Sequence, residues 1–420
     1  MDDIYINRNF LCIDLKSFFA SCECLERNID PFTYPLVVAS NTQGQGAITL
    51  AITPFLKTLG VKSRTRLFDI PKNIKYTIVP PRMSLYVTKS KEVVNVYLDF
   101  VSSDDLHIYS IDECFLDVTN YLKLYKKTDY ELAEEILETV YKKTGLTATC
   151  GIGPNMLLAK LSMDIEAKKY KNGIAKWTYE DIPDKLWPIT PLSKIWGIGP
   201  RMEKNLNILK IYSVEDLAKY DRNILKDKFG VMGLELWNHA NGIDLSRIDD
   251  FKKVPKDKSY SHSQVLFKDY FEDNTKLIIT EMVEVLTARL RKNNNQACII
   301  GFGVNYSKEI QGGFFHSLKL DAPTDSTKEI IKQCNIIFDR YYDFLPIRKV
   351  SISLGGLIRK TGVQLNIFES PEELDNEKRI NETIDEIKNR FGKNSINKAS
   401  SLLKDSTAIS RNEKIGGHHE

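Results

Sequence analysis

Two adjacent carboxylates stand in an unusual setting in the stretch Tyr-Ser-Ile-Asp-Glu-Cys-Phe, residues 109–115. Asp112 and Glu113 lie between apolar and aromatic neighbours, and a third acid, Asp14, ends the short apolar run 10–13, which we interpret as a buried strand. If the strands that carry these acids are neighbours, three carboxylates converge and repel one another, and a divalent cation removes that conflict. Two Mg²⁺ ions about 3.5–4 Å apart would then clamp the attacking and leaving oxygens of a phosphoryl displacement.

The simpler explanation is an acidic turn that faces water, since most acidic side chains are exposed. The tripeptide Ile-Asp-Glu also occurs at 384–386, on a helical stripe formed by Ile380, Ile384, Ile387 and Phe391. There we expect the acids to face water. Residue types and spacing alone therefore favour a solvated turn at 109–115 over a metal site.

The elements that must position these acids follow from hydrophobic periodicity in the first 175 residues. Helices are expected over 17–27, 83–101 and 130–142, and from Asn155 onward. Strands are expected over 10–13, 107–111, 114–118 and 147–152. The middle two strands form a β-hairpin with Asp112 and Glu113 at its tip.

The character of the sequence changes after Gly173. Residues 176–243 show helical periodicity, and a Lys/Pro/Asp-rich linker follows at 251–258. Beyond it we expect a βαββαβ domain and then a polar, mostly helical tail over 363–420. The expected strands of this domain are 259–267, 297–306, 313–320 and 347–358, and its helices are 275–292 and 325–342.

Composition indicates a protein of several domains, and its basic residues are unevenly distributed. It has 420 residues, 42% of them hydrophobic, and a net charge of +3, so two to four domains are expected. Basic residues cluster at 57–75 and 251–260, which could line a groove for a polyanion. Two solvated faces are the alternative, and composition alone favours that alternative. Seven cysteines without C-x-x-C spacing indicate reduced thiols, and we find no signal peptide or membrane-spanning stretch. We therefore expect a cytoplasmic protein.

Three stretches, in order, carry a family resemblance: CIDLKSFFASCE at 12–23, YSIDECFLDV at 109–118 and GIGPNMLLAKLSMDIEAKK at 151–169. They resemble the signatures of the Y-family, the translesion DNA polymerases, and within it the UmuC-like, ImpB-type proteins of Gram-positive bacteria. The resemblance implies an α+β multidomain, right-hand polymerase without proofreading. The implied parts are a palm (1–24 and 81–175), small fingers (25–80), a helix-hairpin-helix thumb (176–245), a linker (246–258), a βαββαβ little finger (259–360) and a polar helical tail (361–420).

Carried over by position, Asp14, Asp112 and Glu113 resemble the metal-binding carboxylates, with the Leu15 carbonyl as a backbone ligand and two Mg²⁺ ions as cofactors. Phe19 matches the aromatic steric gate that excludes a 2′-hydroxyl, and Phe18 is its neighbour at the nucleotide; without the resemblance, Phe19 would be read as a core residue. Asp117 does not match a metal position, and we expect it to stabilise the hairpin.

The nucleotide's triphosphate requires cations. Lys57, in KTLGVK at 57–62, matches the finger-side cation, although Pro54 stands near the place where relatives carry a tyrosine. Lys168 aligns best with a second cation, and Lys169 is the alternative; both could be ordinary exposed lysines. No G-x-x-x-x-G-K-[ST] loop occurs, which argues against an ATPase-type phosphate site.

DNA contacts are implied at three further places. Gly197 and Gly199, between two helical patterns, resemble a helix-hairpin-helix whose backbone amides approach a phosphate; an ordinary turn is the alternative. The linker lysines Lys253, Lys256 and Lys258, with Tyr260, His262 and Gln264 on one face of the following strand, could track primer–template phosphates.

Residues 364–368, Gln-Leu-Asn-Ile-Phe, are similar to the peptide by which bacterial polymerases bind the sliding clamp. Gln364 would form hydrogen bonds, and Leu365 and Phe368 would fill apolar pockets. A tail that packs on its own domain is the alternative. Accessory proteins of the damage response are further possible partners, and no membrane partner is expected.

Two other functions share these residues. A nucleotidyl cyclase could use the same two-metal site, but the helical 176–243 segment and Phe19 argue against it. A clamp-tethered scaffold without catalysis would bind DNA, but it would not need all three carboxylates.

Overall fold

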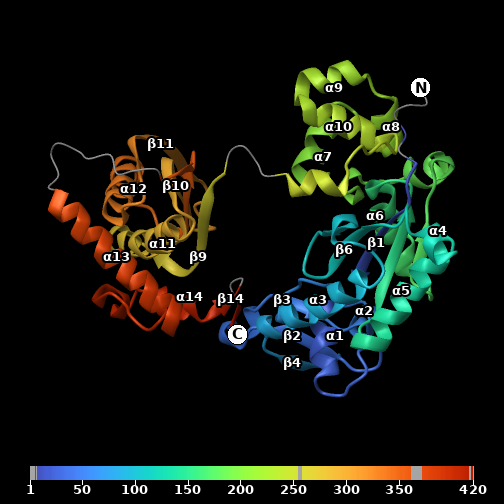
Figure 1. Ribbon diagram of the computed structural model, residues 1–420, viewed down its shortest axis with the longest axis horizontal. Coiled ribbons are helices and arrows are strands. Elements are labelled where there is room, and N and C mark those ends of the chain that lie inside the picture. The colour runs from blue at the N-terminus through green and yellow to red at the C-terminus, as the bar shows by residue number, and fades with distance from the viewer. Residues whose placement is uncertain (1–4, 6, 254–257, 361–370, 416–417, 420) are drawn as a thin grey trace. The chain divides into compact units, whose positions relative to one another are not determined.

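The computed structural model describes residues 5, 7–253, 258–360, 371–415 and 418–419. The chain divides into two compact units, one of Met1–Lys253 with His418–Glu420 and one of Val254–Gly417, and each is described by itself (Figure 1). In the described residues, no helix is both long and apolar enough to cross a membrane.

The first unit is built on a five-stranded sheet with the strand order β5-β6-β1-β7-β8. All neighbours are antiparallel except β7 and β8. The strands are β1 (Phe10–Leu15), β5 (Leu106–Ile108), β6 (Glu113–Asp117), β7 (Ala148–Gly153) and β8 (Ile174–Lys176). The strand of Asp14 and the strand of Glu113 are therefore neighbours, which confirms the expectation on which a shared site depends.

The predicted hairpin is wrong in detail. β5 ends at Ile108 and Glu113 already belongs to β6, so the turn covers 109–112. Two backbone amides, those of Tyr109 and Ser110, bond to the Glu113 carbonyl at 3.0 Å, which closes the turn before the predicted strand end. Glu113 consequently pairs with Asp14 across the ladder instead of standing at a tip.

Alternation along β1 sends its side chains to two different layers. Leu11, Ile13 and Leu15 enter the main core, which α1 (Phe18–Leu25), α3 (Met83–Leu98) and α5 (Asp129–Thr144) cover. Phe10 and Cys12 face the other side, where α6 (Met156–Ile165) packs. Asp14 continues this second series and so lies on the α6 face.

Smaller elements complete the first unit. A three-stranded sheet has the order β3-β2-β4. Its strands are β2 (Leu36–Ala39), β3 (Thr49–Ile52) and β4 (Thr77–Val79), and the short helix α2 (Pro54–Thr58) follows β3. The short helix α4 (Leu122–Tyr125) contacts α5 instead. A helical subdomain with its own core contains α7 (Pro200–Ile208), α8 (Val214–Lys219), α9 (Arg222–Phe229) and α10 (Val231–Ala240).

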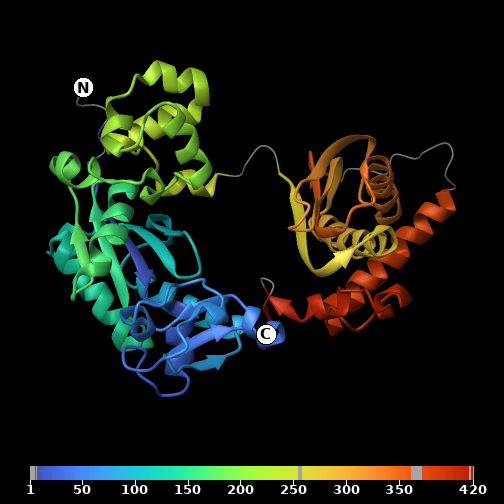
Figure 2. The same cartoon turned by 180° about the vertical axis from the view of Figure 1, so that it is seen from behind.

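The second unit has the predicted βαββαβ order. Its sheet runs β11-β10-β12-β9, with β13 pairing β10, and α11 and α12 lie side by side on one face (Figures 1 and 2). The elements are β9 (Tyr260–Tyr270), α11 (Glu272–Lys292), β10 (Asn295–Tyr306), β11 (Gly313–Thr324), α12 (Thr327–Tyr341), β12 (Ile347–Gly355) and β13 (Ile358–Arg359). Observed boundaries differ from the predicted ones by a few residues.

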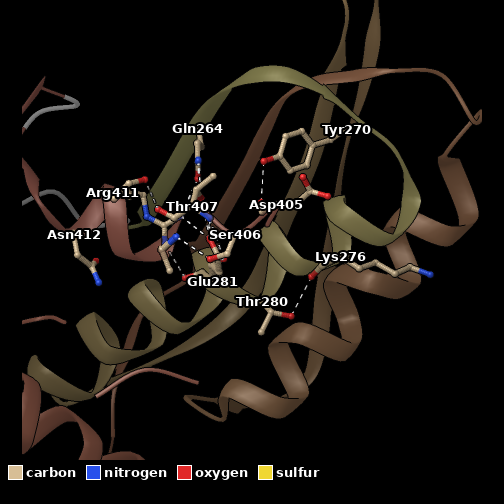
Figure 3. Close-up of polar contacts among 12 residues, drawn as sticks. Gln264, Tyr270, Lys276, Thr280, Glu281, Asp405, Ser406, Thr407, Arg411 and Asn412 are labelled. Atoms are coloured by element: carbon tan, nitrogen blue, oxygen red, sulfur yellow. Dashed lines mark hydrogen bonds and ion pairs between the residues drawn. The ribbon is translucent and has the colours of Figure 1, made fainter. Parts of the chain in front are cut away.

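Residues 371–415 of the tail pack on the second unit. The elements of the tail are α13 (Pro371–Phe391), α14 (Ala408–Asn412) and the two-residue strands β14 (Lys414–Ile415) and β15 (His418–His419). On α11, Glu281 accepts hydrogen bonds from the hydroxyls of Ser406 (2.6 Å) and Thr407 (2.9 Å), as Figure 3 shows. These hydrogen bonds attach residues 406–407 of the tail to α11.

The prediction that the acids of the second Ile-Asp-Glu face water is wrong for Asp385. Asp385 accepts from Nε of Arg291 at 2.7 Å and is half-buried, because α13 contacts α11. Glu386 is exposed, as expected. The apolar stripe is half-buried at Ile384 and Ile387, and its two ends, Ile380 and Phe391, are exposed.

Candidate active site

The three carboxylates predicted from the sequence meet at one corner of the first sheet. Asp14 and Glu113 are direct cross-strand partners. The Leu15 amide donates to the Asp112 carbonyl at 2.9 Å, so Asp112, the last residue of the turn, is also held beside β1. The Ser90 hydroxyl of α3 bonds to the Ile111 carbonyl at 2.6 Å and supports the turn.

Two lysines form ion pairs with two of these three acids, Glu113 and Asp14. Lys160 Nζ lies 2.7 Å from Glu113 Oε1, and Lys168 Nζ lies 2.8 Å from Asp14 Oδ2. Within the described residues, no three histidine, cysteine or acidic side chains form a group that could hold a metal ion. The ammonium groups lie on the oxygens that a cation would need.

Sequence reasoning missed Lys160. The residue lies in the middle of α6, where its neighbours from Met156 to Met163 are buried. A lysine at a buried position of an apolar helix requires an acidic partner. That signal was available in the sequence, and the partner is Glu113.

Burial governs the electrostatics of the corner. It raises the pKa of Asp14, against the attraction of Lys168, and repulsion from Asp112 raises it further. Burial also raises the pKa of Glu113, and the contact with Lys160 opposes that shift. Two acids that resist ionisation because solvent is excluded gain from a nearby cation.

Asp112 is half-buried, and its Oδ1 accepts a hydrogen bond from the Ser110 hydroxyl at 2.6 Å. The corner therefore offers carboxylate oxygens, the donors that Mg²⁺ prefers, and the donor set fits such an ion. Asp117 lies at the other end of β6, opposite Phe10, where it pairs with Arg8 and accepts from the Thr119 amide and hydroxyl. These contacts fasten the end of β6 that lies away from the turn, whereas we expected from the sequence that Asp117 would stabilise the hairpin.

Phe19 is half-buried and stacks on Tyr86, with ring centroids 4.5 Å apart. Phe18 is buried beside it. The Tyr86 hydroxyl donates to Glu23 at 2.8 Å, and this buried glutamate also accepts from Arg82 (2.7 Å) and pairs with Arg27. Sequence reasoning missed this support, although Glu23 lies inside the quoted 12–23 stretch.

The two lysines predicted to bind phosphate, Lys57 and Lys168, influence each other electrostatically, and Asp14 acts on both. Lys57 is exposed on α2. Partial exclusion of solvent lowers its pKa, attraction to Asp14 opposes that shift, and repulsion from Lys168 adds to it. Lys169 forms no ion pair in the described part of the chain, which distinguishes it from Lys168.

The three G-x-G triplets differ in their surroundings. A Cβ on Gly151 would lie 2.0 Å from the Ala159 carbonyl of α6, and one on Gly303 would lie 2.4 Å from the Phe314 carbonyl, so these two triplets permit close packing. Gly197 (φ 89°) and Gly199 have nothing within 4 Å and are exposed. Gly199 is the N-cap of α7, so this triplet leaves its backbone accessible.

The predicted phosphate-tracking face of β9 is wrong. Tyr260, His262 and Gln264 do share a face, but that face is covered: Arg289 of α11 lies over the Tyr260 ring, and Gln264 contacts Thr407 and Arg411 of the tail (Figure 3). Burial lowers the pKa of His262 to about 4. The exposed face of β9 instead carries Ser261, Ser263, Val265 and Phe267.

Other predicted contacts are distributed as follows. Lys253 is exposed and pairs with Asp250 at 2.6 Å, and Lys258 is exposed. Lys256 and the segment 364–368, with Gln364, Leu365 and Phe368, lie outside the described residues.

Comparison with known proteins identifies the family. Residues 13–164 match the impB/mucB/samB family, 179–211 its HHH motif and 257–367 its C-terminal domain. The chain is 40% identical to "Putative UV-damage repair protein UvrX" of Bacillus subtilis (strain 168), covering 98% of this chain and 97% of that protein. It is 33% identical to "DNA polymerase IV 2" of the same organism, covering 97% and 98%.

A solved "Y-family DNA polymerase chimera Dbh-Dpo4(243-245)-Dbh" superposes with a TM-score of 0.65 at 21% identity, covering 84% of this chain and 99% of that one. This likeness concerns the fold. The chain therefore belongs to the impB/mucB/samB family and has the fold of a Y-family DNA polymerase.

Proposed function

We propose that this translesion-type DNA polymerase extends a primer at the corner formed by Asp14, Asp112 and Glu113. The observation that carries the assignment is the cross-strand pairing of Asp14 with Glu113, beside Asp112. Asp14, Asp112, Glu113 and the Leu15 carbonyl would hold two Mg²⁺ ions. When bound, these ions stabilise the charge that develops on the attacking and leaving oxygens of phosphoryl transfer.

The residues around the corner orient the reactants. Lys57 and Lys168 present ammonium groups to the incoming triphosphate, for which a compact point charge is suited. Phe19, fixed by its stacking on Tyr86, fills the space that a 2′-hydroxyl would need, with Phe18 behind it. In this proposal, Phe19 and Phe18 select deoxynucleotides, and the two lysines hold the phosphates.

DNA would be gripped without base recognition. Gly197 and Gly199 expose backbone at the N-terminus of α7, where backbone amides favour a phosphate. The basic linker residues Lys253, Lys256 and Lys258 add phosphate contacts. We assign 1–24 and 81–175 as palm, 25–80 as fingers, 176–245 as thumb, 246–258 as linker, 259–360 as little finger and 361–420 as tail.

We also propose that Gln364, Leu365 and Phe368 bind the sliding clamp. The support is their sequence, Gln-Leu-Asn-Ile-Phe, and their position after the last strand of the little finger. Such tethering, with accessory proteins of the damage response, would place the enzyme on DNA in the bacterial cytoplasm.

Primer extension over damaged and undamaged templates tests the assignment. Asp112→Asn should reduce extension by about a hundredfold or more, and Phe19→Ala should admit ribonucleotides. The matched control is Glu386→Gln, which alters the exposed acid of the second Ile-Asp-Glu and should extend normally. Undiminished extension by Asp112→Asn would remove it from the site.

A further inference from the structure

Three charged residues follow one another at four-residue spacing along α6 and the turn after it. Asp164 Oδ2 lies 3.0 Å from Lys160 Nζ, and Asp164 Oδ1 lies 2.7 Å from Lys168 Nζ. Each oxygen of this carboxylate therefore holds one lysine. Lys160 and Asp164 lie four residues apart on one face of α6, and Lys168 follows in the turn after that helix.

The same two lysines hold Glu113 and Asp14. The contacts form one chain of alternating charge: Glu113, Lys160, Asp164, Lys168, Asp14. Three acids and two lysines give this chain a net charge of −1, and its two ends are cross-strand partners. Within this series of five charged residues, Asp164 is the acid in the middle, and it is the one acid that contacts both lysines.

The two lysines differ in their freedom to move. The Lys160 side chain is 10% exposed and that of Lys168 is 43% exposed. A buried ammonium group needs an acidic partner at all times, whereas an exposed one can be solvated. If Lys160 moves off Glu113, Asp164 is the partner that receives it.

An ammonium group and a divalent cation compete for the same carboxylate oxygens. We propose that Asp164 is a positioning residue of the active site, which draws Lys160 and Lys168 toward itself and so frees Glu113 and Asp14 for divalent cations. The proposal rests on the proposed metal role of those two acids. It gives Asp164 a function that requires no contact with cation, nucleotide or DNA.

Loss of the Asp164 charge should weaken cation binding in two ways. Glu113 and Asp14 become the only acids that the lysines contact, so the lysines compete more strongly with the cation. One negative charge near the site also disappears. Nucleotide binding should instead become stronger or stay the same, because Asp164 no longer competes with the phosphates for Lys168.

The test is Mn²⁺ binding to the full-length protein, measured by the loss of the free-ion electron paramagnetic resonance signal. Asp164→Asn should weaken binding by about three- to tenfold, while Asp164→Glu, which keeps the charge, should bind nearly as the parent does. In primer extension, Asp164→Asn should need more Mg²⁺ to reach half-maximal rate. Its KM for deoxynucleotide at saturating Mg²⁺ should be unchanged or lower.

The matched control is Glu138→Gln, which breaks an exposed glutamate–lysine pair of the same spacing on α5 and should leave Mn²⁺ binding unchanged. Normal Mn²⁺ binding by Asp164→Asn, or equal weakening by Asp164→Glu, overturns the inference. So does a raised nucleotide KM together with a lowered melting temperature, which indicates a structural role. Asp112→Asn separates this inference from the proposed site: if it binds Mn²⁺ normally, the carboxylate assignment itself fails.

Discussion

At the scale of single residues, the buried glutamate Glu23 supports Phe19, the residue that we propose as the steric gate. Its side chain is fully buried, and it receives hydrogen bonds from Tyr86, Arg82 and Arg27. Tyr86 in turn carries Phe19 on its ring. Phe19 is therefore fixed by a carboxylate that it does not touch.

The ionisation of Glu23 should make the stability of the first unit dependent on pH. Burial alone would raise its pKa, but the hydrogen bonds from Arg82, Tyr86 and Arg27 outweigh burial and lower it. An acid with a lowered pKa stabilises the fold above its unfolded-state pKa, about 4.3 for glutamate, and that contribution is lost as pH falls through the folded-state pKa. Glu23→Gln should thus cost about 1–3 kcal/mol at pH 7.

Thermal unfolding of both proteins from pH 7 to pH 3 checks this prediction. The difference between Glu23→Gln and the parent should shrink as pH falls below about 4. A difference that stays constant over this range would show that the charge of Glu23 does not contribute. Glu138→Gln is a suitable control, because its pair with Lys142 is exposed.

At the scale of elements, the close approach of α6 to β7 sets the position of Lys160, the partner of Glu113. Gly151 and Gly153 allow this approach, since a Cβ on either would lie 2.0–2.4 Å from the backbone of Ala159. Asn155 caps α6 by accepting from the Leu158 amide, and Asp244 accepts from the Leu157 amide at 3.0 Å. Strand, cap and helix together direct Lys160 to Glu113.

Gly151→Ala should push α6 from the sheet and lengthen the contact between Lys160 and Glu113. Overpacking of this kind costs about 3 kcal/mol, so the melting temperature of the first unit should fall. Gly199→Ala is the matched control: its φ is −85° and nothing lies within 4 Å, so its melting temperature should hardly change. Equal melting temperatures for Gly151→Ala and the parent would contradict the steric argument.

At the scale of the whole molecule, each unit has its own hydrophobic core. Residues 371–415 of the tail belong to the second unit, and this part of the tail supplies the partners of Glu281, a side chain with 3% exposure. The Thr407 amide and hydroxyl, the Ser406 hydroxyl and Arg411 surround this carboxylate (Figure 3). Without these tail residues, Glu281 would lose the hydrogen-bond donors that compensate its burial.

Calorimetry of the full chain should therefore show two transitions, since separate cores unfold separately. Glu281→Gln should destabilise the second unit by about 1–3 kcal/mol and leave the transition of the first unit in place. Glu386→Gln, an exposed acid of the same tail, should move neither transition. An unchanged second transition in Glu281→Gln would mean that the tail is not part of that unit's fold.

The sequence by itself determined the elements and the identity of the acids. Periodicity predicted the βαββαβ order and the strand that Asp14 ends, because burial of one face imposes a local repeat, but it placed Glu113 at a hairpin tip and not in β6. Family resemblance in three ordered stretches predicted the polymerase. Strand alternation also placed Tyr260, His262 and Gln264 on one face.

Tertiary structure alone decided what those faces and charges contact. Two identical Ile-Asp-Glu tripeptides differ in their partners: Glu113 meets Lys160, while Asp385 meets Arg291. The β9 face expected to meet DNA is covered by α11 and the tail. Such contacts join residues far apart in sequence, and a local pattern contains no information about which distant side chain will arrive to share a buried charge.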